Sequence, residues 1–86
     1  MIREDIESYC QQNGINCLFA DGLDDAIVGL GICFNSYKII YDKNKVIEIL
    51  EKDMSHEEAI EFFEFNIIGS YVGDETPVFL ENLDVY

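Results

Sequence analysis

The sequence predicts an α+β fold in which helices pack on one face of a small, mostly antiparallel sheet. Apolar residues recur at helical spacing near the N-terminus and again between residues 56 and 68. Short apolar runs bounded by turn residues lie between residues 15 and 41 and at 77–80. The 86 residues are enough for one core, so we expect a single domain, 1–86, with the element order α-β-β-β-α-α-β.

The first helix is expected over residues 3–13, where apolar residues alternate with charges at a helical period. Gly14 suits the left-handed backbone position that follows the last turn of a helix. Ile15 can then fold back on Cys10, which is typical of a Schellman-type helix end.

Residues 26–34 form the longest apolar run of the chain and predict a strand that is buried on both faces, and therefore central in the sheet. Gly29 and Gly31 would weaken this strand unless a bulge or a close neighbour requires them. A membrane span needs about 20 apolar residues, so this run does not indicate one.

Three further strands are expected at 15–20, 37–41 and 77–80. A short hairpin connection at 35–36 would join the central strand to the strand at 37–41. The strand at 77–80 is expected at an edge of the sheet, because the proline at its start donates no ladder hydrogen bond.

Two helices are expected in the second half of the chain. Asp42 can cap a helix at 43–52. Ser55 and Glu58 have the S-x-x-E spacing of a capping box, which predicts the start of a helix that runs over 56–68.

The charge distribution is the main functional signal. The chain carries 18 Asp and Glu against 5 Lys and Arg, a net charge of −13, and all the basic residues lie at or before Lys52. This balance argues against direct binding to nucleic acid or to an anionic membrane, since phosphate contacts need a basic patch.

The predicted helix at 56–68 has two sides. A helical wheel places its core stripe at Ala59, Ile60, Phe62, Phe63 and Ile67. Glu57, Glu61 and Glu64 gather on the opposite side, together with Phe65 and Ile68.

Two interpretations of that acidic side stay open. In the first, the glutamates form a solvated face, and the preceding helix or the C-terminal tail covers the two apolar residues. In the second, the apolar residues are anchors ringed by carboxylates and dock on a basic protein surface. On the second hypothesis the partner-binding residues are Glu57, Glu61, Glu64, Phe65, Ile68, Asp74 and Glu75.

Asn66 falls on the apolar side of the same wheel, so we expect it to be buried and hydrogen-bonded to nearby backbone, with a role in ligand binding as the alternative. The following loop, 71–76, could present a recognition surface or serve as a rigid corner that brings in the last strand.

No catalytic or metal-binding constellation is recognisable, and we expect neither an enzyme nor a cofactor. Cys10, Cys17 and Cys33 have no C-x-x-C spacing, and His56 has no nearby ligand partner, so the cysteines are expected to be reduced core residues. The aspartates of the 21–25 turn fit turn capping better than a weak metal site.

The N-terminus is acidic and lacks the apolar region of a signal peptide, which together with the reduced cysteines indicates a cytoplasmic protein.

Two blocks of the sequence, DGLDDAIVGLG and MSHEEAIEFFEFNIIGSYVGDETPVFL, resemble a family of small uncharacterised proteins of tailed bacteriophages and related mobile elements. The segment YDKNKVIEILEKD also resembles the middle helix of that family, so the resemblance covers most of the chain. The matching positions are Asp21, Gly22, Asp25, Ala26, Gly29, Glu57, Glu58, Ala59, Glu61, Phe65, Asn66, Gly69, Tyr71, Val72, Gly73, Thr76 and Pro77. The resemblance carries no activity with it, but it implies a phage-type origin and a cytoplasmic location inside a bacterium.

These observations lead to one expected function and one alternative. We expect a non-enzymatic acidic protein that docks on a basic surface of a bacterial protein, where it could act as a nucleic-acid mimic and inhibit a host defence or transcription factor. The alternative is a structural or assembly module that forms a homo-oligomer or binds another phage protein through Phe65, Ile68 and the edge strand at 77–80. Small-molecule binding would gain support from a deep pocket with Asn66 or Cys33 at its floor.

Overall fold

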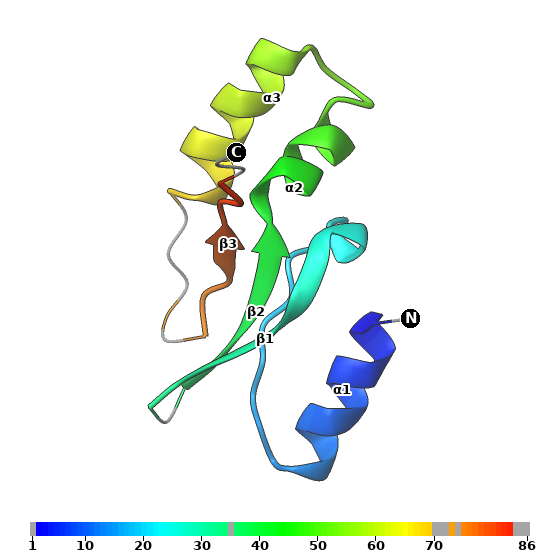
Figure 1. Cartoon of the computed structure of the whole chain (residues 1–86), viewed down its shortest axis with the longest axis vertical. Helices are drawn as coiled ribbons and strands as arrows, with labels where there is room; N and C mark the ends of the chain where they lie inside the picture. Colours follow the sequence, from blue (N-terminus) through cyan, green and yellow to red (C-terminus); the bar gives the residue numbers. More distant parts are fainter. Residues whose placement is uncertain (1, 35, 70–72, 74, 84–86) are drawn as a thin grey trace.

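A computed structural model describes residues 2–34, 36–69, 73 and 75–83 of the chain. It shows an α+β fold built on a mixed sheet of three strands (Figure 1). The elements, in chain order, are α1 (Ile2–Gln12), a 3₁₀ turn η1 (Asp24–Ala26), β1 (Ile27–Cys33), β2 (Ser36–Asp42), α2 (Lys43–Leu50), α3 (His56–Phe62), a π-helical turn η2 (Phe63–Ile67) and β3 (Val78–Leu80).

The predicted helix ends are confirmed where they depend on local hydrogen bonds. Gly14 has a φ of 64° just after α1, and the N–H of Ile15 donates to the carbonyl of Cys10 at 2.9 Å. The Asp42 side chain accepts a hydrogen bond from the backbone N–H of Asn44 at 3.0 Å and so begins α2.

The capping box at the start of α3 is complete. The Ser55 hydroxyl accepts the N–H of Glu58 at 3.2 Å, and the Glu58 carboxylate accepts the N–H of Ser55 at 3.1 Å. Two N–H groups at the helix start are thereby satisfied, which explains why this boundary could be predicted from the sequence.

The sheet order is β1-β2-β3, with β1 antiparallel to β2 and β3 parallel to β2. The prediction that the strand at 26–34 is central is therefore wrong, because β1 lies at an edge and β2 has both neighbours. The physical reason is the crossover through α2 and α3, which returns β3 to the free edge of β2 (Figure 1). An apolar run does not reveal which strand receives that last partner.

The two glycines of β1 lie at a bulge and at a close neighbour, respectively. The register of β1 against β2 shifts between Ile27 and Gly29, which marks a β-bulge. A Cβ atom at Gly31 would lie 2.8 Å from Cδ1 of Ile40, so a larger residue there would force the end of the Ile40 side chain on the neighbouring strand to move.

The prediction of a strand at 15–20 is also wrong. The segment packs against the core through alternate residues, including Ile15, Cys17 and Phe19, which explains its strand-like pattern. It pairs with no described strand. Its N–H at Ala20 instead donates to the hydroxyl of Tyr41 at 2.7 Å. Alternating burial requires an extended backbone, but it does not require a sheet partner.

The core lies on the face of the sheet that carries Ile39 and Tyr41, both of which are fully buried. Phe79 of β3 stacks on Tyr41 and meets the edge of Phe63, with ring centroids 5.6 and 5.2 Å apart. All three helices contribute to this core, whose buried residues are Ile6, Cys10, Leu23, Ala26, Ile27, Ile39, Tyr41, Val46, Ile47, Ala59 and Phe63.

The helix at 56–68 does not keep one geometry to its end. After Phe62 it widens into η2, in which the N–H of Ile68 donates to the carbonyl of Phe63 at 2.8 Å. The wider turn takes up an extra residue and rotates Asn66 away from the buried side. The prediction that Asn66 is buried is therefore wrong, since its side chain is exposed.

Candidate interaction site

The outer side of α3 and η2 carries the residues that the sequence singled out. Ala59 and Phe63 face the core, which leaves the glutamates of the same helix in solvent. Phe65 and Ile68 remain 78% and 56% exposed, so neither α2 nor the described part of the C-terminal segment covers them. We define the acidic α3 face as Glu57, Glu61, Glu64, Phe65 and Ile68.

The spacing within the acidic α3 face places carboxylates directly beside the apolar groups. Glu61 lies four residues before Phe65, and Glu64 lies four residues before Ile68. Side chains at this spacing are neighbours on a helix surface. The result is an exposed pair of apolar side chains with a carboxylate next to each.

The acidic α3 face has no internal counter-charge. Arg3 Nη1 donates to Asp24 Oδ1 at 2.9 Å, and Lys43 Nζ donates to Glu81 Oε1 at 2.6 Å. Within the described ranges, no Lys or Arg forms an ion pair with a glutamate of the acidic α3 face. Its carboxylates therefore remain free to attract an external cation.

Hydrogen bonds lower the pKa of two carboxylates near the helices. Hydrogen bonds from the backbone and hydroxyl of Ser55 lower the pKa of Glu58. The hydrogen bond and charge of Lys43 lower the pKa of Glu81. Both groups serve local structure, and neither belongs to the acidic α3 face.

The remaining predicted partner-binding residues are not part of this surface. Asp74 lies outside the described residues. Glu75 is half-buried and borders a second cleft beside Tyr9, Asn13 and Tyr37, near the end of α1. The structure thus brings five of the predicted residues onto one helical run and places Glu75 elsewhere.

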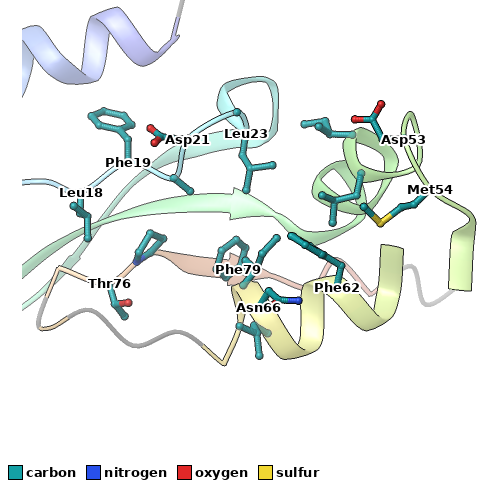
Figure 2. Close-up of a pocket in the computed structure, with 17 residues that line it drawn as sticks. Leu18, Phe19, Asp21, Leu23, Asp53, Met54, Phe62, Asn66, Thr76 and Phe79 are labelled. Carbon is teal, nitrogen blue, oxygen red and sulfur yellow. The ribbon is translucent and has the colours of Figure 1, made fainter. Parts of the chain in front are cut away.

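A cavity of about 760 Å³ opens next to the same helix. Figure 2 shows side chains from the 18–23 segment, the end of α2, α3 with η2, and the residues before β3 around one space. The lining residues with apolar side chains include Leu18, Phe19, Ala20, Leu23, Ile49, Leu50, Met54, Phe62, Ile67, Ile68, Pro77 and Phe79. The polar side chains of the lining are Asp21, Asp53, Asn66 and Thr76.

Sequence reasoning did not locate this cavity, because its walls come from four separate segments that share no motif. The one signal was Asn66, which was named as a possible floor residue of a deep pocket. It does line the cavity, but its side chain is exposed, so it does not form the floor. Cys33, the other residue named, is exposed at the end of β1 and does not contribute.

The cysteines do not form a reactive centre. Sγ of Cys17 lies 3.0 Å from Sγ of Cys10, and burial together with this contact raises the pKa of Cys17 to about 11. His56 Nδ1 contacts the Glu51 carboxylate at the start of α3. In the described part of the chain, no group of three or more His, Cys, Asp or Glu side chains could hold a metal ion.

Comparisons with known proteins give no relative. No protein-family model, no curated protein and no solved structure matches the chain. Over the described ranges, none of the helices has the length and apolar character needed to span a bilayer.

Proposed function

We propose that this protein is a non-enzymatic binding protein whose acidic α3 face docks on a basic surface of a bacterial protein. The observation that carries the proposal is the exposure of Phe65 and Ile68 directly beside unpaired glutamates. Apolar anchors supply most of the energy of an interface, while charges at its rim steer association and select the partner.

The charge of the whole chain supports the same proposal. A net charge of −13 creates a negative field that accelerates encounter with a basic partner. From residue 53 to the C-terminus there are nine acids and no Lys or Arg, so the field is one-sided.

A basic surface of this kind commonly binds nucleic acid, and the carboxylates would then stand in for phosphates. Glu57, Glu61 and Glu64 recur at i, i+4 and i+7, so their carboxylates form a row of negative charge along one side of the helix, as the phosphates do along a nucleic-acid strand. We therefore propose a nucleic-acid mimic that inhibits a host defence or transcription factor. The bacterial cytoplasm as its location, and its phage-type origin, follow from the resemblance of the two sequence blocks and belong to the proposal.

The test begins with a tagged pull-down from nuclease-treated bacterial lysate at low and moderate salt, read by mass spectrometry. The captured protein is then purified, and its affinity is measured against salt and against variants. We expect a steep fall in affinity with salt, and a loss of about tenfold or more in Glu61→Lys/Glu64→Lys, because each reversal replaces attraction by repulsion.

Matched control variants distinguish the contribution of the acidic α3 face to affinity from the effect of overall net charge. Glu4→Lys/Asp5→Lys makes the same charge change on the exposed side of α1. Phe65→Ala is compared with Phe34→Ala, which removes an exposed ring at the hairpin tip. Equal effects of the paired variants, or an affinity that hardly changes with salt, would refute docking through this face.

A second candidate is self-association through β3. This strand lies at the edge of the sheet, and Val78 and Leu80 are 40% and 46% exposed on the face away from the core. Sedimentation at two protein concentrations tests it: a dimer that dissociates on dilution and is lost in Leu80→Lys supports assembly, and a monomer at both concentrations excludes it.

A further inference from the structure

The acidic α3 face does not account for the cavity beside it. We propose that this cavity is a binding site for a small apolar molecule that carries a cationic ammonium group. The proposal does not depend on the docking function, because Ile68 is the only residue of the acidic α3 face that also lines the cavity.

The lining of the cavity indicates that most of the ligand is apolar. Small-molecule sites have volumes of about 300–1,000 Å³ and mostly apolar linings with a few polar groups, and this cavity of about 760 Å³ fits that description. The rings of Phe62 and Phe79 and the flexible side chain of Met54 form much of the wall. Such a wall favours a hydrocarbon chain or ring system.

The charge of the ligand follows from the two ionisable side chains of the lining. Asp21 comes from the 18–23 segment and Asp53 from the turn between α2 and α3, and both are exposed (Figure 2). Among the residues that the structure describes, no Lys or Arg lines the cavity. Arg3 lies over the Phe19 ring at 4.4 Å, but its guanidinium is held by Asp24.

These groups discriminate between ligand classes. Two carboxylates and a net charge of −13 repel a fatty acid or a phosphate and attract an ammonium group. The amide of Asn66, on the opposite side from Asp21 and Asp53, is exposed and can both donate and accept a hydrogen bond (Figure 2). An apolar amine is thus the ligand class that matches both the apolar wall and the two carboxylates of the cavity.

The test uses three probes with the same hydrocarbon chain: octyltrimethylammonium, octanol and octanoate. Binding to the full chain is measured by calorimetry and by NMR shifts of the Asn66 side-chain amide and the Met54 methyl group. We expect the ammonium probe to bind about threefold to tenfold more tightly than octanol, as expected for exposed charge pairs, and octanoate to bind most weakly.

Variants distinguish binding of the probes in the cavity from a general attraction of cations to an acidic protein. Asp21→Asn/Asp53→Asn should abolish the preference for the ammonium probe over octanol while octanol still binds. Glu57→Gln/Glu61→Gln makes the same change in net charge and should leave the preference intact. Leu18→Trp, which fills the cavity from a partly exposed position, should weaken the binding of all three probes.

Several outcomes would overturn the proposal. It fails if no probe shifts the Asn66 and Met54 signals, or if the two double variants reduce the preference equally. It also fails if a short basic peptide with a leucine shifts these signals and none of the three probes does, because the cavity would then belong to the protein interface. Loss of partner docking with intact probe binding would refute only the proposed function.

Discussion

Replacing Tyr41 by phenylalanine tests what holds the unpaired 15–20 segment in place. The Tyr41 hydroxyl accepts the N–H of Ala20 at 2.7 Å. The ring itself stacks on Phe79 and is fully buried, so Tyr41→Phe removes the hydroxyl and keeps the packing. Burial raises the pKa of this hydroxyl, so it stays neutral and the bond persists through neutral pH.

The expected magnitude follows from the fate of the Ala20 N–H. A typical intramolecular hydrogen bond contributes about 0.5–1.5 kcal/mol net, and an unsatisfied buried donor costs about 1–3 kcal/mol. Ala20 is half-buried, so water can replace part of the lost bond. We expect the free energy of unfolding to fall by about 1 kcal/mol, which for a domain of this size lowers Tm by about 4–8 °C.

Urea unfolding followed by circular dichroism measures this loss, and amide hydrogen exchange at Ala20 locates it. The matched control is Tyr37→Phe, a half-buried tyrosine of the same strand whose hydroxyl bonds to no described residue. The reasoning is refuted if both variants lose the same stability, or if exchange at Ala20 is as slow in Tyr41→Phe as in the wild type.

Three further outcomes are expected. Phe63→Ala should destabilise the protein by about 3–5 kcal/mol in urea unfolding, because the buried ring packs against Phe79; a loss below about 1 kcal/mol would contradict the described core. Glu58 has a pKa lowered in the folded state, so its stabilising effect is present above its usual pKa of 4.5 and is lost as pH falls through the lowered value. The stability difference between wild type and Glu58→Gln, which keeps the capping box, should therefore shrink on acidification, whereas a constant difference would speak against a perturbed Glu58. In alkylation at pH 8, the exposed Cys33 should react fast, and Cys17 should react slowly because the pKa of Cys17 is raised to about 11. Equal rates for the two thiols would contradict the contact of Cys17 with Cys10.

The sequence by itself determined the features that depend on neighbours within a few residues. The helix end at Gly14, the cap at Asp42 and the capping box of Ser55 and Glu58 are all contacts over five residues or fewer. The apolar and acidic sides of α3 follow from the helical period, which is equally local. The α+β class followed because these local elements leave few ways to cover a small sheet.

Only the tertiary structure decided which surfaces and partners these elements meet. The return of β3 to β2 made β1 an edge strand, and alternating burial at 15–20 reflected contact with the core rather than a strand pair. The π-helical turn at 63–67 left Asn66 exposed instead of buried, and the exposed side chain borders the cavity. Each outcome depends on contacts between segments far apart in the chain, and local residue patterns do not encode which of these contacts forms.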